Sequence, residues 1–175
     1  MFDLINGLPI HPLVVHAVVV LLPLAALGTI AIAVRPAWRH RYGVLVVVAA
    51  ALSCVLTPVA TSSGEALEKH VGDPGQHAQL GDQLIWFEIP LLVLAVVLVW
   101  LDRRHRAAAA VTEPSHAAGG SSPAVSSTAV KVVAALAVVA ALATSVQVFR
   151  VGDSGARAAW GDQVSSSSAG SSNGN

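Results

Sequence analysis

Apolar residues fall into four long stretches that are separated by polar connections. The stretches cover 13–34, 44–60, 84–101 and 132–149, and together they contain a single carboxylate, Glu88. About 20 apolar residues at 1.5 Å per residue cross about 30 Å of hydrocarbon, so each stretch with its flanks is long enough to span a membrane. No stretch alternates polar and apolar residues, and a backbone in lipid must satisfy its own hydrogen bonds. The pattern therefore predicts an all-α fold, an integral membrane four-helix bundle.

The composition agrees with a membrane protein and excludes several other classes. Hydrophobic residues make up 54% of the 175 residues, and charged residues only 11%, which is far below a soluble domain. Ten Lys plus Arg balance ten Asp plus Glu, so there is no charge surplus for a nucleic-acid partner. The single cysteine, Cys54, excludes a disulfide scaffold.

The basic residues lie mainly in two connections, 35–43 and 102–131. These hold seven of the ten Lys and Arg, so the positive-inside rule predicts that both connections are cytoplasmic. The N-terminal segment 1–12, the connection 61–83 and the Gly-rich segment 150–164 then face outward, and both termini are extracytoplasmic. The basic residues of the two connections are Arg35, Arg39, Arg41, Arg103, Arg104, Arg106 and Lys131.

The two ends of the chain differ from the spans in composition. Residues 1–12 contain Asp3 and no Lys or Arg, unlike the start of a secretory signal, so we expect the first span to be retained. Residues 165–175 are a run of mostly Ser, Gly and Asn, which we expect to be a disordered tail. The expected location is the cell membrane, as a multi-pass protein in a lipid bilayer.

Histidines mark the outer start of the first span. His11 precedes Pro12, and proline is suited to a first helical turn because its missing N–H has no partner there. His16 follows five residues later, about 140° around a helix, so the two rings need not share one face.

The third span begins with a helix-start signal and carries a polar stripe. Residues 73–76 read Asp-Pro-Gly-Gln, which predicts a helix beginning near residue 74. On this helix His77 and Glu88 lie on one stripe, at i and i+11. Two interpretations of Glu88 stay open: a carboxylate that reaches up to water, or a charge or proton partner inside the bundle.

The two halves of the chain share a pattern. His11 and His77 precede the first and third spans, and Ser-Gly pairs at 63–64 and 154–155 follow the second and fourth. This correspondence suggests a duplicated helix hairpin, each copy running in from the outer face and back.

The residues 11–16, His-Pro-Leu-Val-Val-His, resemble the opening of an uncharacterised bacterial membrane family, domain of unknown function 2231. The segment 152–161 resembles the Gly-rich ending of that family, and the resemblance covers about residues 8–163. It implies a four-helix membrane protein and brings no established activity. Ala17 stands where many members have an aromatic residue, and Trp160 where many have histidine, which weakens a ligand role for the ending.

The leading functional hypothesis is haem b binding by a redox or electron-transfer subunit, with a redox membrane partner or a second copy as its partner. Haem needs axial ligands, and facing helices of a bundle can supply them. His16 and His77 come from different spans at a similar expected depth and are the first-choice pair. The further candidates are His11 and His70 as axial ligands, and Lys69, Arg150 and Arg157 beside the haem propionates.

Besides transport or proton conduction, for which only Glu88 and His16 lie within the apolar segments, two alternatives stay open. One is a non-catalytic structural or partner-binding protein without a cofactor. The other is a divalent-metal site on the outer face, built from nitrogen and oxygen ligands. Its candidate ligands are His11, His16, His70, His77 and Glu65. No hydrolase, kinase or dehydrogenase signature occurs, so catalysis is not the expected activity.

Overall fold

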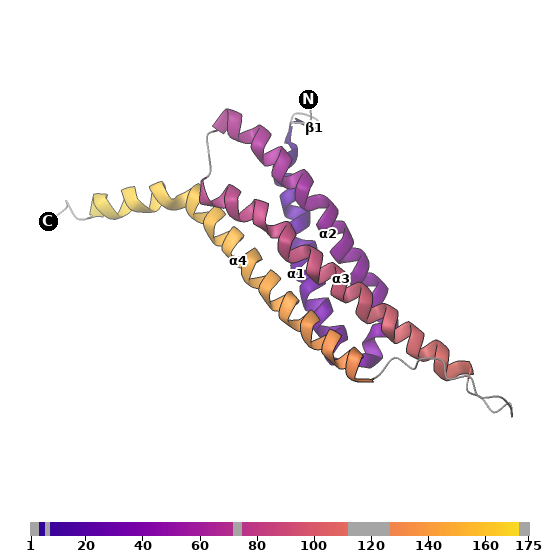
Figure 1. Cartoon of the computed structure of the whole chain (residues 1–175). Helices are drawn as coiled ribbons and strands as arrows, with labels where there is room; N and C mark the ends of the chain where they lie inside the picture. The colour runs from indigo at the N-terminus through magenta and orange to yellow at the C-terminus, as the bar shows by residue number, and fades with distance from the viewer. Residues whose placement is uncertain (1–3, 6–7, 72–74, 112–126, 172–175) are drawn as a thin grey trace.

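Over the residues that it describes, the computed structural model contains four long helices and one pair of very short strands (Figure 1). The helices are α1 (Ile10–Val34), α2 (Pro36–Val71), α3 (Gln76–Val111) and α4 (Ser127–Ser171), and the antiparallel strands are β1 (Leu4–Ile5) and β2 (Leu8–Pro9). The structure describes residues 4–5, 8–71, 75–111 and 127–171, with side chains over 11–68, 75–108 and 128–160. Each helix is long and apolar enough to cross a membrane. The predicted all-helical architecture with four candidate spans is therefore confirmed.

The helices form a closed bundle in which each packs on two neighbours. α1 packs against α2 and α4, and α3 packs against the same two helices from the opposite side. One end of the bundle holds the start of α1, the end of α2, the start of α3 and the middle of α4 (Figure 1). We call this the histidine end, because α1 and α3 begin there with His11 and His77 in their first turns.

Three of the four helices extend well beyond the predicted spans. The expected loop 35–43 lies almost wholly inside α2, and only Arg35 separates α1 from α2. α4 continues to Ser171, so the disordered tail that we predicted from residue 165 is helical as far as 171. The length of an apolar stretch measures the part of a helix that suits lipid, whereas a helix ends only where its hydrogen bonding is interrupted.

Arg39 makes the one-residue connection between α1 and α2 stable. Its Nε donates to Ile32 O at 2.7 Å, and its Nη2 donates to Ala33 O at 2.9 Å. These carbonyls lie in the last turn of α1, where C=O groups have no hydrogen-bond donor within the helix. The positive guanidinium also complements the negative end of the helix dipole. Arg39, which we counted only as a basic loop residue, is 6% exposed and caps α1.

α3 begins at Gln76, close to the predicted start near residue 74. Gly75 has a φ of +59°, a conformation that glycine adopts without steric cost. Its carbonyl accepts a hydrogen bond from Gln79 N at 3.5 Å, so Gly75 is the residue before the first helical turn. Asp73 and Pro74, which we expected to start the helix, lie outside the described residues.

The two hairpins bury corresponding residues, as expected for a duplication. His77 follows His11 by 66 positions, and the same offset relates six buried residues of α1 to six buried residues of α3. We infer that α1–α2 and α3–α4 are two copies of one helix hairpin. The pairs are Val18 and Leu84, Leu22 and Glu88, Ala25 and Leu91, Thr29 and Ala95, Ile32 and Leu98, and Ala33 and Val99.

Candidate functional site

His11 joins α1 to α2 at the histidine end. Its Nδ1 lies 2.9 Å from Ala60 O and 3.3 Å from Ser63 Oγ. A carbonyl oxygen only accepts, so Nδ1 carries the proton. The ring also lies against Gly64, where an added Cβ would stand 3.0 Å from His11 Cε1. Glycine at this position therefore lets the imidazole approach the backbone of α2.

His77 makes the same contact between α3 and α4. Its Nδ1 lies 3.1 Å from Val151 O and 3.4 Å from Ser154 Oγ. An added Cβ at Gly155 would stand 3.0 Å from His77 Cε1. The Ser-Gly pairs that we singled out in the sequence thus each receive a histidine from the preceding helix, which supports the duplication.

The hydrogen bond at Nδ1 determines which nitrogen of each ring can act as a ligand. With the proton on Nδ1, the neutral imidazole of His11 or His77 has a lone pair on Nε2. Among the described residues, no hydrogen bond to Nε2 of either ring is present. Ligating histidines commonly show this arrangement, in which a carbonyl holds the other N–H and orients the ring.

His16 and His70 are not brought into this arrangement. His16 is exposed on α1, and its Nδ1 donates to Pro12 O in its own helix. The 66-residue offset between the hairpins pairs His77 with His11. His16, five residues beyond His11, is therefore not the counterpart of His77. The first-choice pair of His16 and His77 stays a prediction without a shared contact. The side chain of His70 lies outside the described residues.

The predicted arginines lie on the outside of α4. Arg150 is exposed, and its Nη1 donates to Gln147 Oε1 at 3.4 Å. Gln147 is itself buried and donates to Leu80 O at 3.1 Å, which ties α4 to α3. Arg157 pairs with Asp153 at 3.0 Å on the exposed surface, where such pairs contribute little stability.

A metal site of several ligands is not assembled in the part of the chain with described side chains. No group of three or more His, Cys, Asp or Glu residues that could hold an ion occurs there. Glu65 is exposed, and the side chain of Lys69 lies outside the described residues.

Glu88 is buried deep in the bundle. Its side chain is 1% exposed, so of the two interpretations the structure shows a carboxyl inside the bundle. Ser53 Oγ lies 3.1 Å from Glu88 Oε1, and Thr57 Oγ1 lies 2.8 Å from the same oxygen. We did not anticipate these two partners, although hydroxyl residues at i and i+4 in an apolar stretch share one helix face.

The comparisons with known proteins agree with the architecture. The family described as "Predicted membrane protein (DUF2231)" matches residues 7–168. No curated protein and no solved structure matches the chain. The chain therefore belongs to this family of predicted membrane proteins, as its opening and ending motifs suggested.

Proposed function

We propose that this member of the family binds haem b at the histidine end and serves as a membrane electron-transfer subunit, with His11 and His77 as the axial ligands. The observation that carries the proposal is the shared hydrogen bonding of the two rings. Each Nδ1 is tied to a main-chain carbonyl of the adjacent helix, and this leaves Nε2 as the ligating nitrogen. His11 and His77 replace the pair of His16 and His77, because His16 is exposed on α1 and the 66-residue offset pairs His77 with His11 instead.

The chemistry of the donor set suits iron in a haem. Two neutral imidazoles are common axial ligands for one-electron transfer, and an Nδ1–H bonded to a carbonyl increases the basicity of Nε2. Arg150 is exposed near the histidine end and could pair with a propionate. The haem would supply the exchange of one electron between ferric and ferrous iron, while the protein supplies the ligands and their orientation.

The basic connections support an orientation for this site. The end of α1, the start of α2, the end of α3 and the start of α4 lie at the opposite end of the bundle from the two histidines (Figure 1), and these parts of the helices hold most of the Lys and Arg. By the positive-inside rule that end is cytoplasmic. The histidine end then faces outward, where a redox partner would dock.

The test is an absorption spectrum of detergent-purified protein from cells supplied with haem, oxidised and then reduced with dithionite. A Soret band with sharp reduced α and β bands is expected in the parent. His11→Ala and His77→Ala should each abolish or strongly alter it, while the control His16→Ala should retain it. A featureless spectrum from well-folded parent protein would overturn the proposal.

A second candidate is a cofactor-free bundle in which the histidines only hold each hairpin together. The observation that favours it is that, within the described residues, each ring bonds only to the helix that follows it in its own hairpin. In that case the parent shows no haem bands. The only effect of His11→Ala and of His77→Ala is then a lower thermal stability.

A further inference from the structure

A buried polar site lies between α2 and α3, away from the histidines. Glu88 follows His77 by eleven residues, which is about 16 Å along a helix at 1.5 Å per residue. Its side chain is enclosed, and so are those of Ser53 and Thr57, which are 0% and 3% exposed. An ionisable group at such a depth is costly to insert and is commonly functional.

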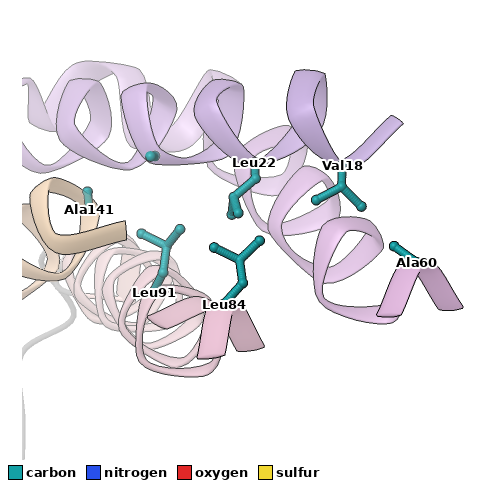
Figure 2. Close-up of a cluster of buried hydrophobic side chains, with 7 residues drawn as sticks. Val18, Leu22, Ala60, Leu84, Leu91 and Ala141 are labelled. Carbon is teal, nitrogen blue, oxygen red and sulfur yellow. The ribbon is translucent and has the colours of Figure 1, made fainter. Parts of the chain in front are cut away.

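The equivalent position of the first hairpin holds an apolar side chain instead of a carboxyl. By the 66-residue offset, Glu88 corresponds to Leu22 of α1, and both side chains are 1% exposed. Figure 2 shows Leu22 pointing into the centre of the core opposite Leu84 and Leu91. The first hairpin thus fills the equivalent place with an ordinary apolar side chain, so packing alone does not explain Glu88.

Among the side chains that the structure describes, the carboxyl has hydroxyl partners but no cation. Both hydroxyls approach Oε1, whereas Oε2 is buried and has no hydrogen-bond partner among the described residues. The two salt bridges of the described part are Arg106 with Asp102 and Arg157 with Asp153. An ionised Glu88 would therefore leave a charged oxygen unpaired in an apolar interior, which is strongly unfavourable.

The hydroxyl of Thr57 shows how a proton would be accommodated. Thr57 Oγ1 lies 2.8 Å from Glu88 Oε1 and 3.1 Å from Ser53 O, yet a hydroxyl has only one proton to donate. If Glu88 is protonated on Oε1, it donates to Thr57 Oγ1, and Thr57 donates to Ser53 O. Both contacts are then satisfied, whereas an ionised carboxylate would leave only one of them as a hydrogen bond.

We propose that Glu88, with Thr57 and Ser53, is a proton-binding site in the interior of the bundle that exchanges its proton with the surrounding water. The site takes up one proton on the carboxylate and releases it again, and Thr57 reorients between Glu88 and Ser53 O. This function does not depend on haem at the histidine end.

The other ionisable groups around the site are few, so a proton signal can be assigned. On α2 the nearest is Cys54, which is partly buried beside Ser53. α1 has no ionisable residue between His16 and Arg35, and α4 has none between Lys131 and Arg150. On α3 itself the flanking acids are Asp82 and Asp102, and Asp82 is exposed.

The experiment is infrared difference spectroscopy of the purified full chain in liposomes, titrated with pH in H2O and in D2O. The expected result is a C=O stretching band of a protonated carboxylic acid that is lost in Glu88→Gln and retained in the control Asp82→Asn. The band should decrease reversibly as pH rises and should shift in D2O. A band that sodium ions abolish at constant pH would contradict a proton site, because a cation would then be the ligand.

Two further variants keep the test decisive if Glu88→Gln fails to fold. Ser53→Ala and Thr57→Val each remove one hydroxyl contact with Oε1, so each should shift the C=O band without abolishing it. The proposal is overturned if folded parent protein shows no protonated carboxyl band, or if the band is insensitive to pH, to D2O and to both hydroxyl variants.

Discussion

The α1–α2 hairpin and the α3–α4 hairpin are alike at their ends and different at their centres. Each begins with a histidine that bonds to a carbonyl and a serine of the following helix and lies against a glycine. Halfway along, one copy buries Leu22 and the other buries Glu88. The contact is present in both hairpins and joins the two helices of each, whereas the buried carboxyl is present in the second hairpin and replaced by leucine in the first. Four experiments test that distinction.

The largest effect is expected when the first hairpin is given the residue of the second. Leu22→Glu places a carboxyl in an apolar core cluster, among Leu84, Leu91 and Ala141. The free energy of unfolding should fall by about 3 kcal/mol, the insertion cost of a central charge. Titration with SDS in mixed micelles measures it, with Leu22→Met as the control of similar volume. If Leu22→Glu lowers the free energy of unfolding no more than Leu22→Met does, then position 22 tolerates a carboxyl as well as position 88, and the hydroxyl partners of Glu88 do not distinguish the two positions.

Removal of Arg39 should weaken the first hairpin alone. Arg39→Gln loses the charged donors to Ile32 O and Ala33 O and should cost about 2 kcal/mol. Faster hydrogen exchange is expected in the last turn of α1, with no change in α3. The exposed Arg103, replaced by Gln in the same way, is the control and should change stability by less than about 0.5 kcal/mol. Equal effects of the two variants would exclude the capping role.

The two glycines beneath the histidines should respond alike. Gly64→Ala and Gly155→Ala each place a Cβ 3.0 Å from a ring carbon, and each should lower stability by about 1 kcal/mol through overpacking. Gly152 has no atom within 4 Å of an added Cβ, so Gly152→Ala should instead raise stability by up to about 1 kcal/mol. Thermal unfolding in detergent measures whether each variant lowers or raises stability. Opposite effects at Gly64 and Gly155 would argue against equivalent contacts.

The smallest effect is expected when the second hairpin is given the residue of the first. Glu88→Leu removes a buried carboxyl and leaves Thr57 bonded to Ser53 O, so stability should stay within about 1 kcal/mol of the parent or rise slightly. The SDS titration used for Leu22→Glu measures it. A large loss would mean that Glu88 is required for folding rather than for proton binding.

Much of the architecture could be predicted because a membrane-spanning helix depends on the apolar content of a stretch of about 20 residues. Four apolar stretches were enough to predict four helices for a membrane, and the proline at the start of the motif 11–16 agrees with a helix that begins at Ile10. The ends of the helices could not be predicted in the same way. Polar residues such as those of 61–71 and 150–171 continue a helix as readily as they leave it, because helical hydrogen bonds are indifferent to side-chain polarity.

The candidate site was predicted in its parts but not in its pairing. His11, His77 and the two Ser-Gly pairs were recognised as a repeated pattern, and the structure joins each histidine to the Ser-Gly pair of its own hairpin. Ser53 and Thr57 were overlooked because hydroxyl residues are unremarkable in an apolar helix, where they can bond to their own backbone.

The sequence by itself determined the number of helices, their suitability for a membrane and the family to which the chain belongs. These properties follow from the amount and period of apolar residues, which each segment carries independently of its neighbours. Only the tertiary structure decided that Arg39 caps α1, that His16 is left outside and that Glu88 is enclosed with two hydroxyls. The direction of a side chain depends on which helix packs against it, and that contact joins residues distant in the sequence.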